Sequence, residues 1–394
     1  MLTTKSLRML LGIGFILLAV SCTPATNTPM PEASAQPALS PTSTAPAAQI
    51  TPTAQTPTGL IISQPPGENN GEAVGLAFQP DGKVLASLYR NGKIILWDVD
   101  TYQIVQSLPG GGEIGGLGIM PGLAFSSDGK FLVSTSNGGT PILWAVATGE
   151  SIEVERNLSG GNGMALNPDG TMLAYGKCAE VSPNSICTQY TIILWDIAAR
   201  QPVGQSLIFN VGASAPLGLL FSPDGKTLAA ISSGTTGSGK IELFDTVTRQ
   251  SITSPLGGEE QFSGMAFTPD GKFMALGSIG GVIYIWDVKS HDVVSRLISE
   301  HGLITGMAFS PNGKILATRI FTPSTENILH EEIVLWDMNS LQMIGQPLTG
   351  QAATGNDVGL ISAAFSPDSA TLVSGTDDGV IILWNLAAKD SQVP

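Results

Sequence analysis

Residues 264–287 read GMAFTPDGKFMALGSIGGVIYIWD, and this stretch decides the fold. A small-apolar alternation over residues 264–267 leads into the tight turn Thr268-Pro269-Asp270-Gly271, after which a second short apolar stretch begins. Proline presets the backbone for the second position of a type I turn, so these residues predict a β-hairpin. A third short apolar stretch ends at Trp286-Asp287. The segment therefore predicts three consecutive antiparallel strands.

The same pattern occurs seven times between Gly59 and Pro394. Its third-strand aromatic residues lie 42 to 51 residues apart and include all six tryptophans of the protein. They are Trp97, Trp144, Trp195, Phe244, Trp286, Trp336 and Trp384. A fourth short strand follows, for example Val293 to Ile298, and four strands in a repeat of this length are typical of a β-propeller blade. We therefore expect an all-β protein, with residues 59–394 forming a single seven-bladed β-propeller of four-stranded antiparallel blades.

The ring is expected to close with an N-terminal strand. The last repeat shows no convincing fourth strand in residues 387–394, whereas Leu60 to Pro65 stands before the first repeat. Pairing of this early strand with the last blade would remove an open sheet edge that could template aggregation.

The endings of the third strands resemble those of WD-repeat propellers. Tryptophan or phenylalanine is followed by aspartate in five of the seven repeats, at Asp98, Asp196, Asp245, Asp287 and Asp337. Ala145 and Asn385 depart from this pattern. The resemblance implies a binding platform whose partner the fold does not specify. The Gly-His dipeptide of that family is missing from nearly every repeat, and only His301 lies near its position. We therefore expect the blades to rest on apolar packing and on the tryptophans.

The first residues resemble a bacterial lipoprotein signal. Lys5 and Arg8 precede an apolar run over residues 9–20, which is too short for a membrane span of about 20 residues. The run ends at Ser21-Cys22, like a lipobox whose cysteine is lipidated. Residues 1–21 are thus expected to be a cleaved signal peptide, and Cys22 a membrane anchor that carries acyl chains such as palmitate. An ordinary signal peptide with a chance cysteine is the alternative.

Residues 22–58 are expected to be a disordered tether. Thr, Pro, Ala and Ser supply 28 of the 36 residues from Thr23 to Thr58, and such a segment buries too little apolar surface to order itself. Its eight prolines favour an extended polyproline II conformation. The expected location is extracytoplasmic, on the cell surface or in the periplasm.

Composition excludes several function classes. The chain carries 32 acidic and 18 basic residues, a formal charge of −14, so nucleic acid is not an expected partner. His291, His301 and His330 belong to no catalytic motif, and the aspartates of the repeated turns are explained by turn chemistry. We therefore expect no enzyme, no metal site, no cofactor and a monomeric chain. A propeller hydrolase with scattered carboxylates is the minority alternative.

Connection lengths predict which face of the disc binds a partner. The first-to-second and third-to-fourth connections of each blade share one face, the short-turn face, and the former are five residues long throughout. The opposite face, the long-loop face, carries the second-to-third and inter-blade connections. The predicted second-to-third loops run from 6 to 16 residues. Length variation on a rigid scaffold is where binding loops usually lie, with neutral drift as the alternative.

Two of these insertions carry distinctive residues. The third repeat contains Cys178 and Cys187, which we expect to form a disulfide in an exported chain. A metal pair is the alternative, although no other cysteine or histidine is nearby in the sequence. The sixth repeat has a polar insertion over residues 319–332, read as a solvated loop or as a contact patch.

The long-loop face should be net acidic and should bind a protein with a basic or mixed patch. Phe321 and Tyr190 are the expected apolar anchors. The candidate residues are Glu180, Tyr190, Glu259, Glu260, Glu300, Phe321, His330, Glu331, Glu332 and Asp357. In the alternative interpretation, the acidic residues only keep an exported protein soluble. A role in envelope assembly is a second functional hypothesis.

Overall fold

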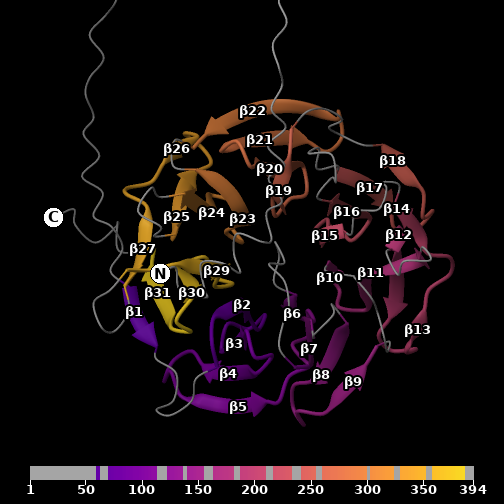
Figure 1. Ribbon diagram of the computed structural model, residues 1–394, viewed down its shortest axis with the longest axis horizontal. Coiled ribbons are helices and arrows are strands. Elements are labelled where there is room, and N and C mark those ends of the chain that lie inside the picture. Colours follow the sequence, from indigo (N-terminus) through magenta and orange to yellow (C-terminus); the bar gives the residue numbers. More distant parts are fainter. Residues whose placement is uncertain are drawn as a thin grey trace, which may run out of the picture. The chain divides into compact units, whose positions relative to one another are not determined.

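The computed structural model describes residues 59–62, 70–112, 122–135, 140–154, 163–181, 187–209, 216–232, 241–253, 260–299, 302–323, 329–351 and 357–386. The regular secondary structure in these ranges consists of β-strands alone. The strands form seven antiparallel blades arranged in a ring (Figure 1). The prediction of a seven-bladed β-propeller is therefore confirmed. The predicted signal peptide, Cys22, the tether, Glu259 and Glu300 lie outside the described residues.

Each blade follows one meander from the centre of the ring to its rim. Blades 1 and 2 consist of β2 (Ala73–Phe78), β3 (Val84–Tyr89), β4 (Ile94–Asp98), β5 (Ile104–Leu108), β6 (Leu123–Phe125), β7 (Phe131–Thr135), β8 (Pro141–Ala145) and β9 (Ser151–Glu153). Blade 3 consists of β10 (Met164–Leu166), β11 (Met172–Val181), β12 (Cys187–Asp196), β13 (Gln201–Pro202) and β14 (Leu207–Phe209). Blade 4 consists of β15 (Pro216–Phe221), β16 (Thr227–Ser232), β17 (Ile241–Asp245) and β18 (Ser251–Thr253).

The remaining blades continue the ring in the same way. Blade 5 consists of β19 (Phe262–Phe267), β20 (Phe273–Ser278), β21 (Val282–Asp287) and β22 (Asp292–Ile298). Blade 6 consists of β23 (Leu303–Phe309), β24 (Ile315–Pro323), β25 (Leu329–Asp337), β26 (Gln342–Met343), β27 (Leu348–Gln351) and β28 (Asp357–Val358). Blade 7 consists of β29 (Leu360–Phe365), β30 (Thr371–Thr376), β31 (Ile381–Asn385) and β1 (Gly59–Ile62). The first strand of each meander lies innermost (Figure 1).

The N-terminal strand closes the ring, as predicted. β1 pairs antiparallel with β31, with Gly59 opposite Trp384 and Ile62 opposite Ile381. Ile62 is 7% exposed and packs into the core between blades 7 and 1, whereas Ile61 is 41% exposed. The described strand covers residues 59–62, and residues 63–65 of the predicted strand lie outside the described part of the chain.

The repeated aromatic residues occupy the third strand of every blade, and four of the tryptophans share a hydrogen bond that the sequence analysis missed. Each indole N–H donates to a buried hydroxyl on the second strand at 2.8 to 3.0 Å. The pairs are Trp97–Ser87, Trp144–Ser134, Trp336–Thr318 and Trp384–Ser374. The N–H group of each of these buried indoles therefore has a hydrogen-bond acceptor.

Of the three blades outside this set, blades 4 and 5 have no hydroxyl group at the equivalent position of the second strand. The hydroxyl position lies two residues beyond the cross-strand partner of the aromatic residue, and it is Ala230 in blade 4 and Leu276 in blade 5. Blade 4 has Phe244, which carries no N–H to satisfy. Blade 5 keeps Trp286, whose buried Nε1 has no hydrogen-bond partner among the described residues.

The turns between the first and second strands are held by their own side chains, as turn chemistry predicts. In blade 2, the Asp128 carboxylate accepts hydrogen bonds from the backbone N–H of Lys130 at 3.0 Å and from the hydroxyl of Ser126 at 2.7 Å. These donors, the backbone N–H first, lower the pKa of Asp128 to about 2. In blade 6, Asn312 accepts the equivalent hydrogen bonds with an uncharged side chain.

This turn chemistry predicts how stability depends on pH. The folded-state pKa of Asp128 lies below the unfolded value near 4, so its ionised form stabilises the fold above about pH 4. Hydrogen bonding also lowers the pKa values of Asp169, Asp224, Asp270 and Asp368 in the equivalent turns. The urea midpoint should therefore hold near pH 5 and fall as the pH drops from about 4 toward 2. The Asp128→Asn variant, which copies the natural turn at Asn312, should lose less of its midpoint over this interval. An equal loss in variant and wild type would contradict the assignment.

Candidate functional site

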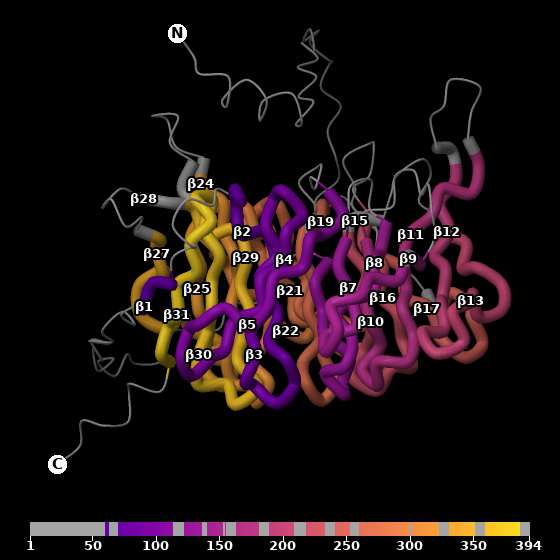
Figure 2. The backbone as a smooth tube through the Cα atoms, turned by 90° about the horizontal axis from the view of Figure 1, so that it is seen from below, coloured from indigo at the N-terminus to yellow at the C-terminus, as the bar shows by residue number. Residues whose placement is uncertain are grey.

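Two long β-hairpins distinguish blades 3 and 6 from the others. Strands β11 and β12 are 10 residues each, and β24 and β25 are 9 each, whereas the second and third strands of the other blades have 5 or 6. Both hairpins extend toward the long-loop face (Figure 2). The prediction of loops at these insertions is wrong, because the ladder continues through pairs such as Lys177–Thr191 and Phe321–Glu331. β-branched and aromatic residues supply the strand preference there.

The two cysteines lie on opposite strands of the blade 3 hairpin. Cys178 is opposite Tyr190, and Cys187 is opposite Val181. Irregular register lies between these pairs. The side chain of Cys187 lies outside the described part, so the disulfide stays a prediction.

The predicted contact residues of blade 3 have opposite exposures. Glu180 is exposed on β11. Tyr190 is 7% exposed, and burial raises the pKa of its hydroxyl. Tyr190 therefore presents little surface to a partner, and its burial does not support a role as an apolar anchor.

In blade 6 the hairpin brings part of the predicted patch together. Phe321 on β24 and Glu331 on β25 are paired and both are partly buried. Glu332 is partly buried and pairs with Ile320 and Thr349. His330 and Asp357 have strand positions in β25 and β28, but their side chains lie outside the described part.

Carboxylates from three neighbouring blades influence one another near this hairpin. Burial raises the pKa of Glu331, and the charges of Asp377 in blade 7 and Glu72 in blade 1 raise it further. The positive charge of Arg319 acts in the opposite direction. Glu72 also accepts a hydrogen bond from Nε of Arg90 at 2.9 Å. Acidic side chains of blades 6, 7 and 1 thus lie close enough to influence one another's charge on the long-loop face.

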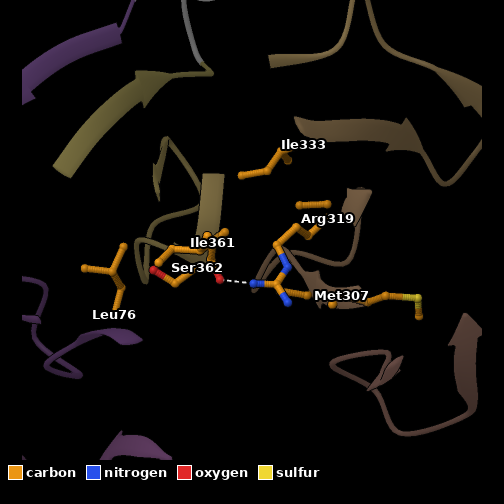
Figure 3. A pocket seen from close by; sticks show the side chains of 10 residues that line it. Leu76, Met307, Arg319, Ile333, Ile361 and Ser362 are labelled. Carbon is orange, nitrogen blue, oxygen red and sulfur yellow. Dashed lines mark hydrogen bonds between the residues drawn. The ribbon is translucent and has the colours of Figure 1, made fainter. Parts of the chain in front are cut away.

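Arg319 corrects a second expectation from the sequence, which placed it at the start of a solvated loop over residues 319–332. It lies in β24, where its Nε donates to the Thr305 hydroxyl at 2.8 Å and its Nη1 donates to the carbonyl oxygen of Ile361 in blade 7. Burial lowers the pKa of this guanidinium. The residue bridges blades 6 and 7 beside a cavity of about 200 Å³ (Figure 3).

Glu260 takes part in a second polar group on blade 5. It accepts a hydrogen bond from the Tyr284 hydroxyl at 2.8 Å, and the Arg296 guanidinium lies 5.2 Å from the centre of the Tyr284 ring. Phe262 meets the same ring edge-on, with 5.8 Å between centroids. Burial, followed by the hydrogen bond to Glu260, raises the pKa of Tyr284. Glu260 is exposed and is held in a fixed position that a partner can meet.

The described residues hold neither a cluster of metal ligands nor a membrane-spanning helix. Within the described ranges, no group of three or more histidine, cysteine, aspartate or glutamate side chains is arranged to hold a metal ion. Across the same part of the chain, no helix has the length and apolar character needed to span a membrane.

Comparison with known proteins agrees with the propeller architecture. A family described as "WD domain, G-beta repeat" matches residues 120–145, 251–287 and 349–385. A second family, "Anaphase-promoting complex subunit 4 WD40 domain", matches residues 58–117.

The curated relatives are much longer than the matched segments. Echinoderm microtubule-associated protein-like 1 of Rattus norvegicus is 36% identical over 98 residues, which are 25% of this chain and 11% of that protein. Echinoderm microtubule-associated protein-like 2 of Homo sapiens is 26% identical over 233 residues, 59% of this chain and 32% of that protein. The match thus spans between about a tenth and a third of these relatives.

Proposed function

We propose that this seven-bladed propeller of WD40 repeats is a membrane-anchored, extracytoplasmic platform that binds a protein partner at its long-loop face. WD40 propellers generally bind protein partners and are generally non-enzymatic scaffolds. The observation that carries the proposal is the pair of extended hairpins, β11–β12 and β24–β25, which reach toward one face (Figure 2).

The path of the chain supports this orientation. Gly59 pairs with Trp384 near the end of β31, where that strand arrives at the short-turn face. Residues that precede Gly59 therefore join the ring at the short-turn face. The chain thus enters the ring at the face opposite the proposed partner surface.

The charge of the long-loop face supports a partner with a basic or mixed patch. Asp377, Glu180 and Glu260 are exposed on this face. A concentration of one sign of charge accelerates encounter with an oppositely charged partner, and salt screens the effect over about 8 Å at physiological ionic strength. The microtubule association in the relatives' names is a property of those proteins.

Anchoring through Cys22 gives a direct prediction. In the Cys22→Ser variant, the protein should leave the membrane fraction and enter the soluble envelope fraction or the medium, because the anchoring thiol is gone. Its melting temperature should equal that of the wild type, because Cys22 precedes the propeller. Fractionation followed by immunoblotting measures the distribution. A variant that stays with the membranes to the same extent would mean that another contact holds the protein.

Trimming the hairpin tips tests the binding face without removing core residues. Residues 323–329 can be replaced by Asn-Gly between Thr322 and His330, which are paired across the hairpin. Asn-Gly forms a two-residue turn suited to such a junction. A photo-crosslinker at exposed Glu180 should capture a specific protein in native membranes, and trimming should reduce this product while the melting temperature is unchanged.

The matched control places the crosslinker on the opposite face. Val247 is 79% exposed in the turn between β17 and β18, at the short-turn face. Capture of the same protein from Val247, or undiminished capture by the trimmed variant, would move the binding site away from the hairpins.

A further inference from the structure

A cavity of about 200 Å³ lies between the inner strands of blades 6 and 7, beside the centre of the ring. Its walls are mostly apolar and include Met307, Ile333 and Leu76, which come from blades 6 and 1. Among the described residues, Arg319 is the only charged one that lines it. Figure 3 shows the guanidinium lying between Met307 and Ile361, with its hydrogen bond to the Ile361 carbonyl oxygen. The cavity thus combines an apolar interior with one cation.

The inner strands show why a cavity exists at this junction. Six of the seven inner strands carry a large apolar residue at the same position, two residues before the phenylalanine or leucine that ends the strand. These residues are Leu76, Leu123, Met164, Leu219, Met265 and Met307. In blade 7 the position is Ala363, which lines the cavity. The smaller side chain leaves the space open.

The facing strand departs from its own repeat at the same place. Arg319 lies three residues after Leu316, the cross-strand partner of Trp336. The residues at the equivalent position of the other second strands are Leu88, Thr135, Gly176, Ile231, Gly277 and Gly375. None of them is charged. The cavity is therefore lined by a charged residue of blade 6, Arg319, and by an alanine of blade 7, Ala363, where the other inner strands have a larger side chain. Departures from a local pattern that coincide in space are expected at functional sites.

The guanidinium of Arg319 has hydrogen-bond acceptors for only some of its N–H groups, and no carboxylate among the described residues forms an ion pair with it. Nε and Nη2 donate to the hydroxyl and carbonyl of Thr305, at 2.8 and 3.4 Å, and Nη1 donates to the carbonyl of Ile361. A guanidinium has five N–H donors, so two have no acceptor among the residues that the structure describes. Among the described residues, no carboxylate lies within 4.0 Å of it. Glu331 acts on it only from farther away, and burial favours the neutral form of that carboxyl. Arg319 is partly buried, and charges withdrawn from water in proteins are normally paired.

We propose that this cavity binds a carboxylate that carries a short apolar chain, with the carboxylate on Arg319 and the chain beside Met307 and Ala363. A cavity of about 150 Å³ is large enough for benzene, so this space suits roughly six to ten non-hydrogen atoms. A free branched-chain or short fatty acid has this chemistry, and so does the C-terminal residue of a peptide that ends in leucine. Arg319 and Ile333 lie in the body of the β24–β25 hairpin, so the site is distinct only from the hairpin tip at residues 323–329.

The binding test uses the full chain and four probes. The first pair is 4-methylpentanoate and its neutral amide, and the second pair is a leucine-terminated pentapeptide with a free or an amidated C-terminus. Titration calorimetry or ligand-observed NMR should show saturable binding of at least one carboxylate, with its amide weaker by at least about tenfold, because a charge-assisted hydrogen bond is lost. Binding by the free acid alone assigns the site to a small molecule, and binding by the free peptide assigns it to a chain terminus.

The variants separate the site from general effects on the fold. Ala363→Leu restores the residue type of the other repeats, so it should fold normally while filling the cavity and weakening binding by at least about tenfold. Arg319→Leu should weaken binding similarly by removing the charge. Arg296→Leu, which removes an exposed arginine on blade 5, should bind like the wild type. The proposal is overturned if no carboxylate binds saturably, if the amides bind equally well, or if Ala363→Leu and Arg319→Leu bind as the wild type does.

Discussion

A chain that begins at Ser63 is expected to unfold at a much lower temperature than a chain that begins at Gly59. Both lack the residues before the propeller, and only the shorter one lacks β1. Without β1, four residues of β31 lose their cross-strand partners, and the core around Ile62 becomes exposed to solvent. Burial of one such side chain contributes about 1.5–3 kcal/mol, and each ladder hydrogen bond adds roughly 0.5–1.5 kcal/mol. The sum is several kcal/mol, and an open strand edge also promotes aggregation.

Calorimetry of the two chains measures this effect, and point variants refine it. Ile62→Asp buries an unpaired charge and should mimic much of the deletion. Ile61→Asp changes the neighbouring residue, which is 41% exposed, and should have little effect. Equal melting temperatures for the chains beginning at Ser63 and Gly59 would show that the ring does not depend on β1.

Trp144→Ala is expected to cost about 3–5 kcal/mol, the usual loss for removing a large aromatic side chain from a core. Trp144 is 2% exposed and packs between blades 1 and 2. Its indole N–H also donates to Ser134 at 2.8 Å. The two contributions can be separated by phenylalanine, which keeps most of the ring and removes the N–H.

The phenylalanine comparison uses two blades of the same protein. Trp144→Phe should cost more than Trp286→Phe, because only Trp144 loses a hydrogen bond and leaves a buried hydroxyl behind. The difference should be about 1–2 kcal/mol in the free energy of unfolding, measured with urea. Equal costs in blades 2 and 5 would mean that the indole hydrogen bond adds nothing to stability.

Most of the fold could be predicted because its determinants are local and repeated. The turns, the third-strand tryptophans and the missing fourth strand of the last repeat each have a signature within a few residues. The hydroxyl partners of the tryptophans also had such a signature, since Ser87, Ser134 and Ser374 each lie 10 residues before their tryptophan. Sequence reasoning overlooked it.

The site was harder to predict because side-chain direction depends on register. Residues 319–332 contain many polar side chains, which suggested a loop. Once β24 continues to Pro323, alternation places Thr318 and Ile320 on one side of the strand and Arg319 on the other. Arg319 then faces blade 7, and its partner Ile361 is 42 residues away in the chain. No local pattern reports a contact between blades at that separation.

The pairing of β1 with β31 also determines how the protein would carry mechanical load. A force applied through the residues before Gly59 reaches the ring through β1, whose four residues pair with Ile381–Trp384. When the opposing force acts at the long-loop face, the pull runs along the strands and loads all four pairs together in shear. The lifetime of the ring under tension is then set by the rate at which this short ladder breaks. The strand that completes the last blade is thus also the part of the propeller that would first bear a force applied through the residues before Gly59.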